Sequence, residues 1–293
     1  MATKYVKRSG DRPDGRRLRS LSGFFDFIPY IMPDRNDAML FYEQSFDITE
    51  VEKWLRVQRD NGYKGMGMLH LFIAAYIRVI ASLPALNRFV IGRRIYSHDD
   101  ITVVMAVKRS LALDAPETTV KVHFSPSDTV YDVYRKLNAE IDKVKSGEDN
   151  DVESFTARAK KLPRFVLRFI LWVIRVLDYL GKLPARAIEL SPFHGSMMIT
   201  DLGSLGVSPV FHHIYNFGTL PVFISFGAKR KTYDICDGGR CTVERKYVDA
   251  KITLDERIVD GHYYASVIKL LGTYVKDPTK LEVPPEIVKQ DTF

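Results

Sequence analysis

Residues 255–261 read Asp-Glu-Arg-Ile-Val-Asp-Gly and lie near the C-terminus of the 293-residue chain. The segments on either side of them differ in the spacing at which apolar residues recur. The preceding run, 242–254, has the composition of a β-strand, and apolar side chains recur at helical spacing over 261–275. We therefore predict a strand, a turn and an amphipathic helix that begins beside Asp260 and ends before Pro278.

A second short motif, Met-Ile-Thr-Asp-Leu-Gly-Ser-Leu-Gly at residues 198–206, overlaps the end of a predicted strand at 196–200. Its glycines indicate a turn, and a further strand is predicted at 222–226. His212 and His213 follow this turn, so they are candidates for the edge of the same cleft.

The rest of the chain alternates between helical and strand periods. Apolar side chains recur at helical spacing over 66–83, where Pro84 ends the helix, and a capping box at Thr49 and Glu52 begins another helix. Further strands are predicted at 41–48, 89–96, 101–107 and 118–124, and a further helix runs from 128 to 145. Strands interleaved with helices over the whole length predict an α/β fold, a two-layer sandwich with a mixed β-sheet flanked by helices.

Together these segments resemble the catalytic cores of the dihydrolipoyl acyltransferases of 2-oxo acid dehydrogenase complexes and the chloramphenicol acetyltransferases. In that family the C-terminal motif is His-x-x-x-Asp-Gly, usually within Asp-His-Arg-x-x-Asp-Gly, and the upstream turn is Ile-Ser/Thr-Asn-Leu-Gly. The order of the elements also matches over residues 25–281. The resemblance implies a chloramphenicol-acetyltransferase-like fold and a CoA-dependent acyltransferase domain, with its site between the subunits of a homotrimer.

The resemblance also implies roles for single residues. The family's histidine removes the proton of a thiol, and a hydroxyl stabilises the oxyanion of the tetrahedral intermediate. Glu256 stands at the histidine's position and Thr200 at that of the hydroxyl, while Asp260 and Gly261 match the motif. The expected CoA-binding residues are Arg257, Gly261 and Ser204, and no metal is expected.

Two positions depart from the family pattern, because Glu256 replaces the histidine and Asp201 replaces the frequent asparagine. Moving a thiol proton to an unperturbed glutamate costs about 3 kcal/mol more than moving it to histidine, unless burial raises the carboxyl pKa. An ionised aspartate at 201 cannot donate the hydrogen bond that asparagine would. His262 is an alternative base, whereas His70 and His123 are expected to be packed within a helix and a strand.

Two functions stay open at this point. The first is an enzyme in which Glu256 serves as base and an acyl group moves between CoA and a small acceptor, or a lipoyl domain of another protein. The second is a catalytically silent CoA-binding or trimeric assembly module. A catalytic Glu256 is expected to be shielded from solvent, free of a cation partner and within reach of a channel, whereas a structural one is expected to pair with Arg257 or Arg35. Arg35 is otherwise the expected partner of Asp260.

A net charge of +7 favours anionic partners, such as the CoA pyrophosphate or an acidic membrane surface. Seven of the basic residues crowd the first twenty positions, so we predict a basic flexible arm at 1–23, a catalytic domain at 24–283 and a tail at 284–293. Nucleic-acid binding is not expected, because no aromatic–basic platform or recognition motif accompanies the charge.

The most hydrophobic window is 165–180, which is short for a membrane span and contains Arg168 and Arg175. Such a helix is either buried in the protein or an oligomer, or lies on a membrane surface. We favour burial, with the arginines facing solvent or an anionic ligand. The apolar segment 24–33 carries two prolines and is predicted to be an extended or docking segment.

Two cysteines, Cys236 and Cys241, flank the tip of a predicted hairpin and are close enough in sequence to pair. The chain lacks the cysteine density of a secreted module and an N-terminal signal peptide, so we predict a cytoplasmic protein.

Overall fold

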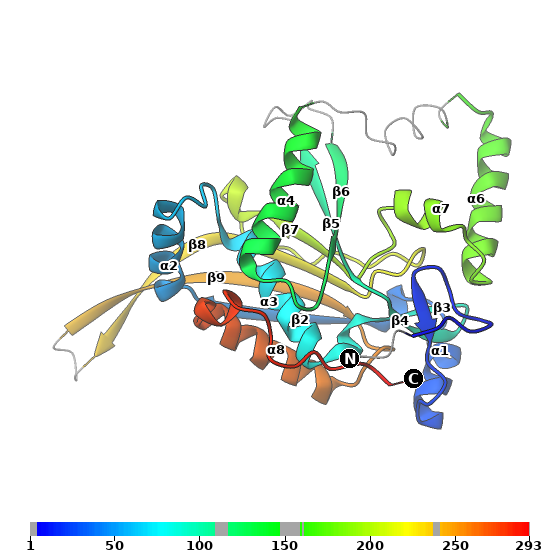
Figure 1. Cartoon of the computed structure of the whole chain (residues 1–293), viewed down its shortest axis with the longest axis horizontal. Coiled ribbons are helices and arrows are strands. Elements are labelled where there is room, and N and C mark those ends of the chain that lie inside the picture. The colour runs from blue at the N-terminus through cyan, green and yellow to red at the C-terminus, as the bar shows by residue number, and fades with distance from the viewer. Residues whose placement is uncertain (1–4, 109–116, 147–158, 160, 237–240, 293) are drawn as a thin grey trace.

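The computed structural model describes residues 5–292 except 109–116, 147–158, 160 and 237–240. Its centre is a six-stranded sheet with the order β2-β9-β8-β7-β5-β6 (Figure 1). β7 runs parallel to both of its neighbours and the other pairs are antiparallel, so the sheet is mixed as predicted. The strands are β2 (Met39–Asp47), β5 (Ile101–Lys108), β6 (Glu117–Phe124), β7 (Met197–Asp201), β8 (Val222–Cys236) and β9 (Cys241–Asp255).

Helices cover one face of this sheet. They are α2 (Thr49–Asp60), α3 (Met68–Ser82), α4 (Val130–Lys145) and α8 (Gly261–Lys276), which lie along the sheet in Figure 1. Alternation along each strand separates two sets of buried side chains. In β7, Met197 and Ile199 belong to the large core beneath the helices, whereas Met198 packs on the opposite face with Leu220 and Ile214. The connection from β7 to β8 therefore covers part of the face without helices.

The hairpin of β8 and β9 is longer than predicted. β8 continues for ten residues past the predicted end at Phe226, with a register shift between Phe226 and Lys229, and the hairpin projects beyond the rest of the sheet in Figure 1. The backbones of Cys236 and Cys241 are paired at its end. The hairpin tip and any bond between these two side chains lie outside the described residues.

A smaller sheet with the order β1-β4-β3 comprises β1 (Gly15–Arg17), β3 (Arg88–Ile91) and β4 (Arg94–His98). The prediction of one strand at 89–96 was wrong, because Gly92 and Arg93 form a two-residue turn between two strands. Their φ angles are 56° and 59°, and positive φ at both central residues is typical of the tight turns that twist with a hairpin.

The segments predicted as a flexible arm and a tail contain anchored residues. Arg12 is buried and its guanidinium binds Asp14 (2.8 Å) and Asp178 (2.9 Å), while Leu18 is buried in the core. Near the other end, Asp291 forms a buried ion pair with Arg88 at 2.6 Å. Asp178 and Asp291 lie far in sequence from the arginines they bind, so these pairs are not visible in composition, which is why the basic residues looked like a solvated arm.

Two helix starts use other caps than the predicted ones. The capping box of Thr49 and Glu52 does not form, because Asp47 accepts the hydrogen bond from the Thr49 amide (2.9 Å) and Glu52 pairs with Lys229 (2.5 Å). The helix predicted from residue 128 begins at Val130, with Thr129 as its cap.

Two apolar segments differ from their predictions. Residues 24–33 are not extended throughout, since α1 spans Gly23–Ile31 and accommodates a proline in its last turn. The predicted helix at 165–180 is α6 (Arg164–Tyr179), but none of residues 164–177 is fully buried, so the expected burial is absent within one chain. α6 lies at the edge of the molecule in Figure 1 and is followed by α7 (Ala185–Leu190). Among the described residues, no helix is both long and apolar enough to cross a bilayer.

Candidate active site

The motif 255–261 leaves the end of β9 and enters α8. Asp255 is fully buried, and two arginines hold its carboxylate: Arg257 Nε and Nη2 lie 2.8 and 2.7 Å from its oxygens, and Arg35 Nε lies at 3.1 Å. Burial alone would raise the pKa of Asp255, but the hydrogen bonds from Arg257 and the charge of Arg35 keep it below its ordinary value. We call these three residues the Asp255 clasp.

The remaining donors of the clasp bind main-chain oxygens. Arg35 donates to Tyr215 O (2.6 Å), Gly218 O (2.9 Å) and Val90 O (3.0 Å). Arg257 donates to Met32 O and Pro33 O, both at 3.2 Å. The clasp therefore joins the segment 32–35 before β2, the turn before β8 and the smaller sheet around the end of β9.

The partners expected for Arg35 were wrong, since Arg35 pairs with Asp255 and neither with Glu256 nor with Asp260. Asp260 instead caps α8, because its Oδ1 accepts a hydrogen bond from the Tyr263 amide at 2.7 Å. Arg257, expected to bind CoA, is buried within the clasp.

Glu256 is exposed on the surface of the single chain, so the shielding from solvent expected of a catalytic carboxylate is absent within one chain. Its amide donates to Ala38 O at 2.9 Å, which fixes the backbone, and its carboxylate has no ion pair or hydrogen bond with any residue that the structure describes. His262 and Gly261 are also exposed, in the first turn of α8. The two arginines able to neutralise Glu256 are occupied by its neighbour, which leaves this carboxylate available to another molecule.

The second motif forms a tight turn after β7. Asp201 Oδ1 accepts from the Ser204 amide (2.9 Å), and Ser204 Oγ donates to Asp201 O (2.8 Å). Gly203 is required there, because a Cβ would lie 2.5 Å from Gly227 O, and Gly206 has a φ of +74°. Burial raises the pKa of Asp201 despite hydrogen bonds from the amides of this turn. Aspartate thus serves as the acceptor that caps the turn.

The turn also lines a cavity of about 440 Å³. Asp201, Gly203 and Ser204 form one side, and the N-terminus of α3 at Gly67 and Lys229 are also part of its wall. The amides of a helix N-terminus and a lysine both favour a negatively charged ligand.

The two motifs do not meet within one chain. Thr200 pairs with Ser225, which pairs with Lys251, and Glu256 lies five residues further along the chain. At about 3.4 Å per residue and about 4.8 Å per strand, the two residues are separated by roughly 17 Å along the strands and roughly 10 Å across them. One chain therefore cannot place Thr200 and Glu256 on the same reacting group.

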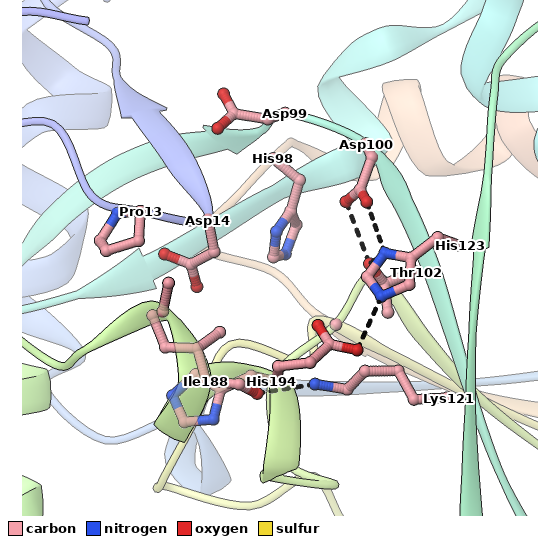
Figure 2. Close-up of a pocket in the computed structure, with 13 residues that line it drawn as sticks. Pro13, Asp14, His98, Asp99, Asp100, Thr102, Lys121, His123, Ile188 and His194 are labelled. Atoms are coloured by element: carbon pink, nitrogen blue, oxygen red, sulfur yellow. Dashed lines mark hydrogen bonds and ion pairs between the residues drawn. The ribbon is translucent and has the colours of Figure 1, made fainter.

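A separate polar cavity of about 170 Å³ lies beside the smaller sheet and is shown in Figure 2. His123 lies in it between Asp100 (2.5 Å) and Glu189 (3.0 Å), whose hydrogen bonds raise the pKa of the ring to about 9. Burial lowers the pKa of Lys121 to about 8, and its Nζ donates to Ile188 O. We call this the histidine cavity.

The histidine cavity was missed by sequence reasoning, which assigned His123 to packing. His98 also lines it, with burial lowering its pKa, and its Nε2 has no hydrogen-bond partner among the described residues. The only sequence signal was Lys121 and His123 at alternate positions of one strand, which places both on the same face. Nowhere in the described ranges do three or more His, Cys, Asp or Glu side chains form a group suited to a metal ion.

Comparison with known proteins gives a fold and no sequence relative. No family model and no curated protein matches the sequence. Solved structures do match, among them a probable dihydrolipoamide acetyltransferase from Listeria monocytogenes, with a TM-score of 0.57 and 15% identity over 88% of this chain and 93% of that one.

Two further structures give similar values. The cubic core of a pyruvate dehydrogenase multienzyme complex has a TM-score of 0.57 and 15% identity, covering 91% of this chain and 94% of that one. A chloramphenicol acetyltransferase has a TM-score of 0.56 and 12% identity, covering 89% and 99%. The fold expected from the two motifs, that of the acyltransferase catalytic cores, is thereby confirmed.

Proposed function

We propose that the chain is a CoA-dependent acyltransferase whose site is completed between neighbouring subunits, as in a homotrimer. The observation that carries this proposal is the state of Glu256. It stands at the position of the family's histidine, on the fold of the acyltransferase cores, and Arg35 and Arg257 are bound to Asp255 instead. A glutamate retained for structure alone would be expected to have a cation on it.

The distance between the two motifs within one chain is the reason for proposing a site between two subunits. Glu256 of one subunit and Thr200 of the next would face the same acyl group, since one chain holds them at opposite ends of the strands. A second subunit over Glu256 would also remove water from its carboxylate, which makes a carboxylate a stronger base. This compensates for the weaker basicity of glutamate relative to histidine.

The reaction we propose is a nucleophilic acyl transfer. Glu256 accepts the proton of the acceptor, whose thiol, hydroxyl or amine then attacks the thioester carbonyl of acyl-CoA. The Thr200 hydroxyl donates a hydrogen bond to the oxyanion. Collapse of the tetrahedral intermediate breaks the carbon–sulfur bond, and the departing CoA thiolate takes the proton back from Glu256.

Support for a CoA site comes from the cavity beside Ser204. The N-terminus of α3 and Lys229 suit a pyrophosphate, although Lys229 also pairs with Glu52. The acceptor in this proposal is a small molecule or a lipoyl domain of another protein.

Release of free CoA from acetyl-CoA and longer acyl-CoAs, in the presence of a thiol acceptor, tests the proposal. We expect Glu256→Gln to lower turnover at least 100-fold and Glu286→Gln, which changes another exposed glutamate, to leave it unchanged. An inert wild type that gains activity as Glu256→His would instead identify a catalytically silent binding or assembly module.

A further inference from the structure

Two cavities on the side of the Asp255 clasp share Arg175, Asn216 and Phe217 in their walls and so form one continuous groove. Their volumes are about 490 and 330 Å³. α6 forms one side, and the segment 215–217 lies opposite. We call this the α6 groove.

The smaller part of the groove is apolar. Leu171 and Ile174 of α6 face Phe193, Tyr215 and Phe217, and Arg175 is the only charged residue among those that line it in the described chain. The centroid of the Phe193 ring lies 4.8 Å from that of Tyr215 and 5.8 Å from that of Phe217, so Phe193 packs against both of the other rings of the aromatic wall. A surface of this kind takes an alkyl chain, because almost all of it is apolar and it gains by leaving water.

The larger part of the groove is cationic. Four arginines and two aspartates line it: Arg35, Arg93, Arg175, Arg257, Asp34 and Asp178. The carboxylate of Asp178 already binds Arg12, and Arg35 and Arg257 share a single carboxylate behind the wall. Positive charge is therefore in excess over this part of the groove.

Arg93 and Arg175 are the cations available to a ligand. Neither forms an ion pair with any residue that the structure describes, and the Arg93 guanidinium lies over the face of the Tyr30 ring, 5.6 Å from its centroid. Asp34 is the one carboxylate of the wall without a cation partner in that part of the chain. An anion placed between Arg93 and Arg175 would gain two charge-assisted hydrogen bonds.

We propose that the α6 groove binds a single-chain amphiphile whose acyl chain lies along Leu171, Ile174 and Phe217 and whose anionic head group lies against Arg93 and Arg175. The head group is a carboxylate or a phosphate, as in a fatty acid or a lysophospholipid. Binding requires no acyl transfer, so this proposal and the proposed function can fail separately.

Isothermal titration of the full chain tests the proposal with five probes below their critical micelle concentrations. They are dodecanoate, dodecanoyl lysophosphatidate, neutral monododecanoylglycerol, butyrate and inorganic phosphate. We expect the two anionic twelve-carbon ligands to bind and the neutral ester to bind more weakly, with affinity rising about fourfold per methylene of the chain. The tighter of the two identifies the head group.

Substitutions in the groove separate the contribution of the head group to binding from that of the alkyl chain. Arg175→Gln should weaken both anionic ligands about tenfold and leave the neutral ester unchanged, whereas Arg168→Gln is the matched control, because it removes the same charge from the same helix outside the groove. Ile174→Gln should weaken all three twelve-carbon ligands. Circular dichroism of each variant reports that the fold is retained.

Three results would overturn the proposal. The first is an absence of binding of both twelve-carbon anions to the wild type. The second is equal weakening by Arg175→Gln and Arg168→Gln, since general surface charge would then explain the affinity. The third is binding of butyrate or inorganic phosphate as tight as that of the long chains.

Discussion

The Asp255 clasp and the histidine cavity hold charged side chains in opposite ways. In the clasp, two arginines share one carboxylate that is fully buried, whereas in the cavity two carboxylates share one imidazole ring that is 45% exposed. Water screens the second arrangement and not the first. The clasp should therefore determine whether the chain folds, and the cavity should determine how its stability varies with pH.

The largest expected effect is that of Asp255→Asn. Removing the carboxylate leaves two buried guanidinium groups without a counter-charge, which costs about 3–5 kcal/mol of the free energy of unfolding. Urea denaturation measures this loss. Glu256→Gln, the same chemical change one residue later, should cost less than about 0.5 kcal/mol, because the Glu256 carboxylate has no ion pair or hydrogen bond with any described residue that the substitution would break. Equal losses would mean that the clasp does not hold this end of β9.

An intermediate effect is expected from Arg35→Met, which leaves Arg257 to neutralise Asp255. The carboxylate keeps two hydrogen bonds from Arg257, but three main-chain oxygens lose their donor. We expect a loss of about 2–3 kcal/mol, smaller than that of Asp255→Asn, from the same denaturation experiment. If Arg35→Met lowered the free energy of unfolding more than Asp255→Asn does, the Asp255 carboxylate would not be the centre of the clasp.

The smallest effect is that of His123→Gln, and it depends on pH. The folded pKa of about 9 exceeds the ordinary value of 6.5, so this ring stabilises the fold fully below about pH 6.5 and loses its contribution as pH rises through 9. Because the ring is half-exposed, we expect a difference from wild type of about 1 kcal/mol at pH 6 that disappears near pH 10.

The charged groups around the His123 ring also contribute to the pH dependence of stability. Asp100 and Glu189 face His123. Lys121, whose pKa is lowered to about 8, makes stability rise with pH above pH 8, opposite to the effect of His123. Because the wild type and His123→Gln both retain Lys121, its contribution cancels when their stabilities are subtracted. His262→Gln serves as control, since His262 is exposed and hydrogen-bonded to no described carboxylate. A His123→Gln difference that is constant with pH would contradict the ion pairs.

The sequence was informative wherever one segment contains all the residues that interact. The motifs 198–206 and 255–261, with the strand before each turn and the helix after the second, led to the correct fold because both are local patterns. The partner of Arg35 was not predictable, since Asp255 and Asp260 lie in the same motif and only tertiary packing decides which one is buried. The burial of Arg12 was missed for the same reason.

The histidine cavity and the α6 groove were also beyond sequence reasoning. Each is assembled from several separate segments, those of the histidine cavity lying between Pro13 and Gly195 and those of the α6 groove between Pro33 and Arg257. No single segment has a pattern that marks its side chains as neighbours. α6 itself was predicted as a helix, but its exposure depends on how the chain returns from α6 to β7.

The central claim is that Glu256 and Thr200 of different subunits form one acyltransferase site, and subunit mixing tests it most directly. Glu256→Gln and Thr200→Val should each be inactive alone. After the two are unfolded and refolded together, about one site in four should combine both wild-type residues, giving about a quarter of wild-type CoA release for random mixing in a symmetric oligomer. A mixture as inactive as its components, from an oligomer shown to exchange subunits, would contradict the account.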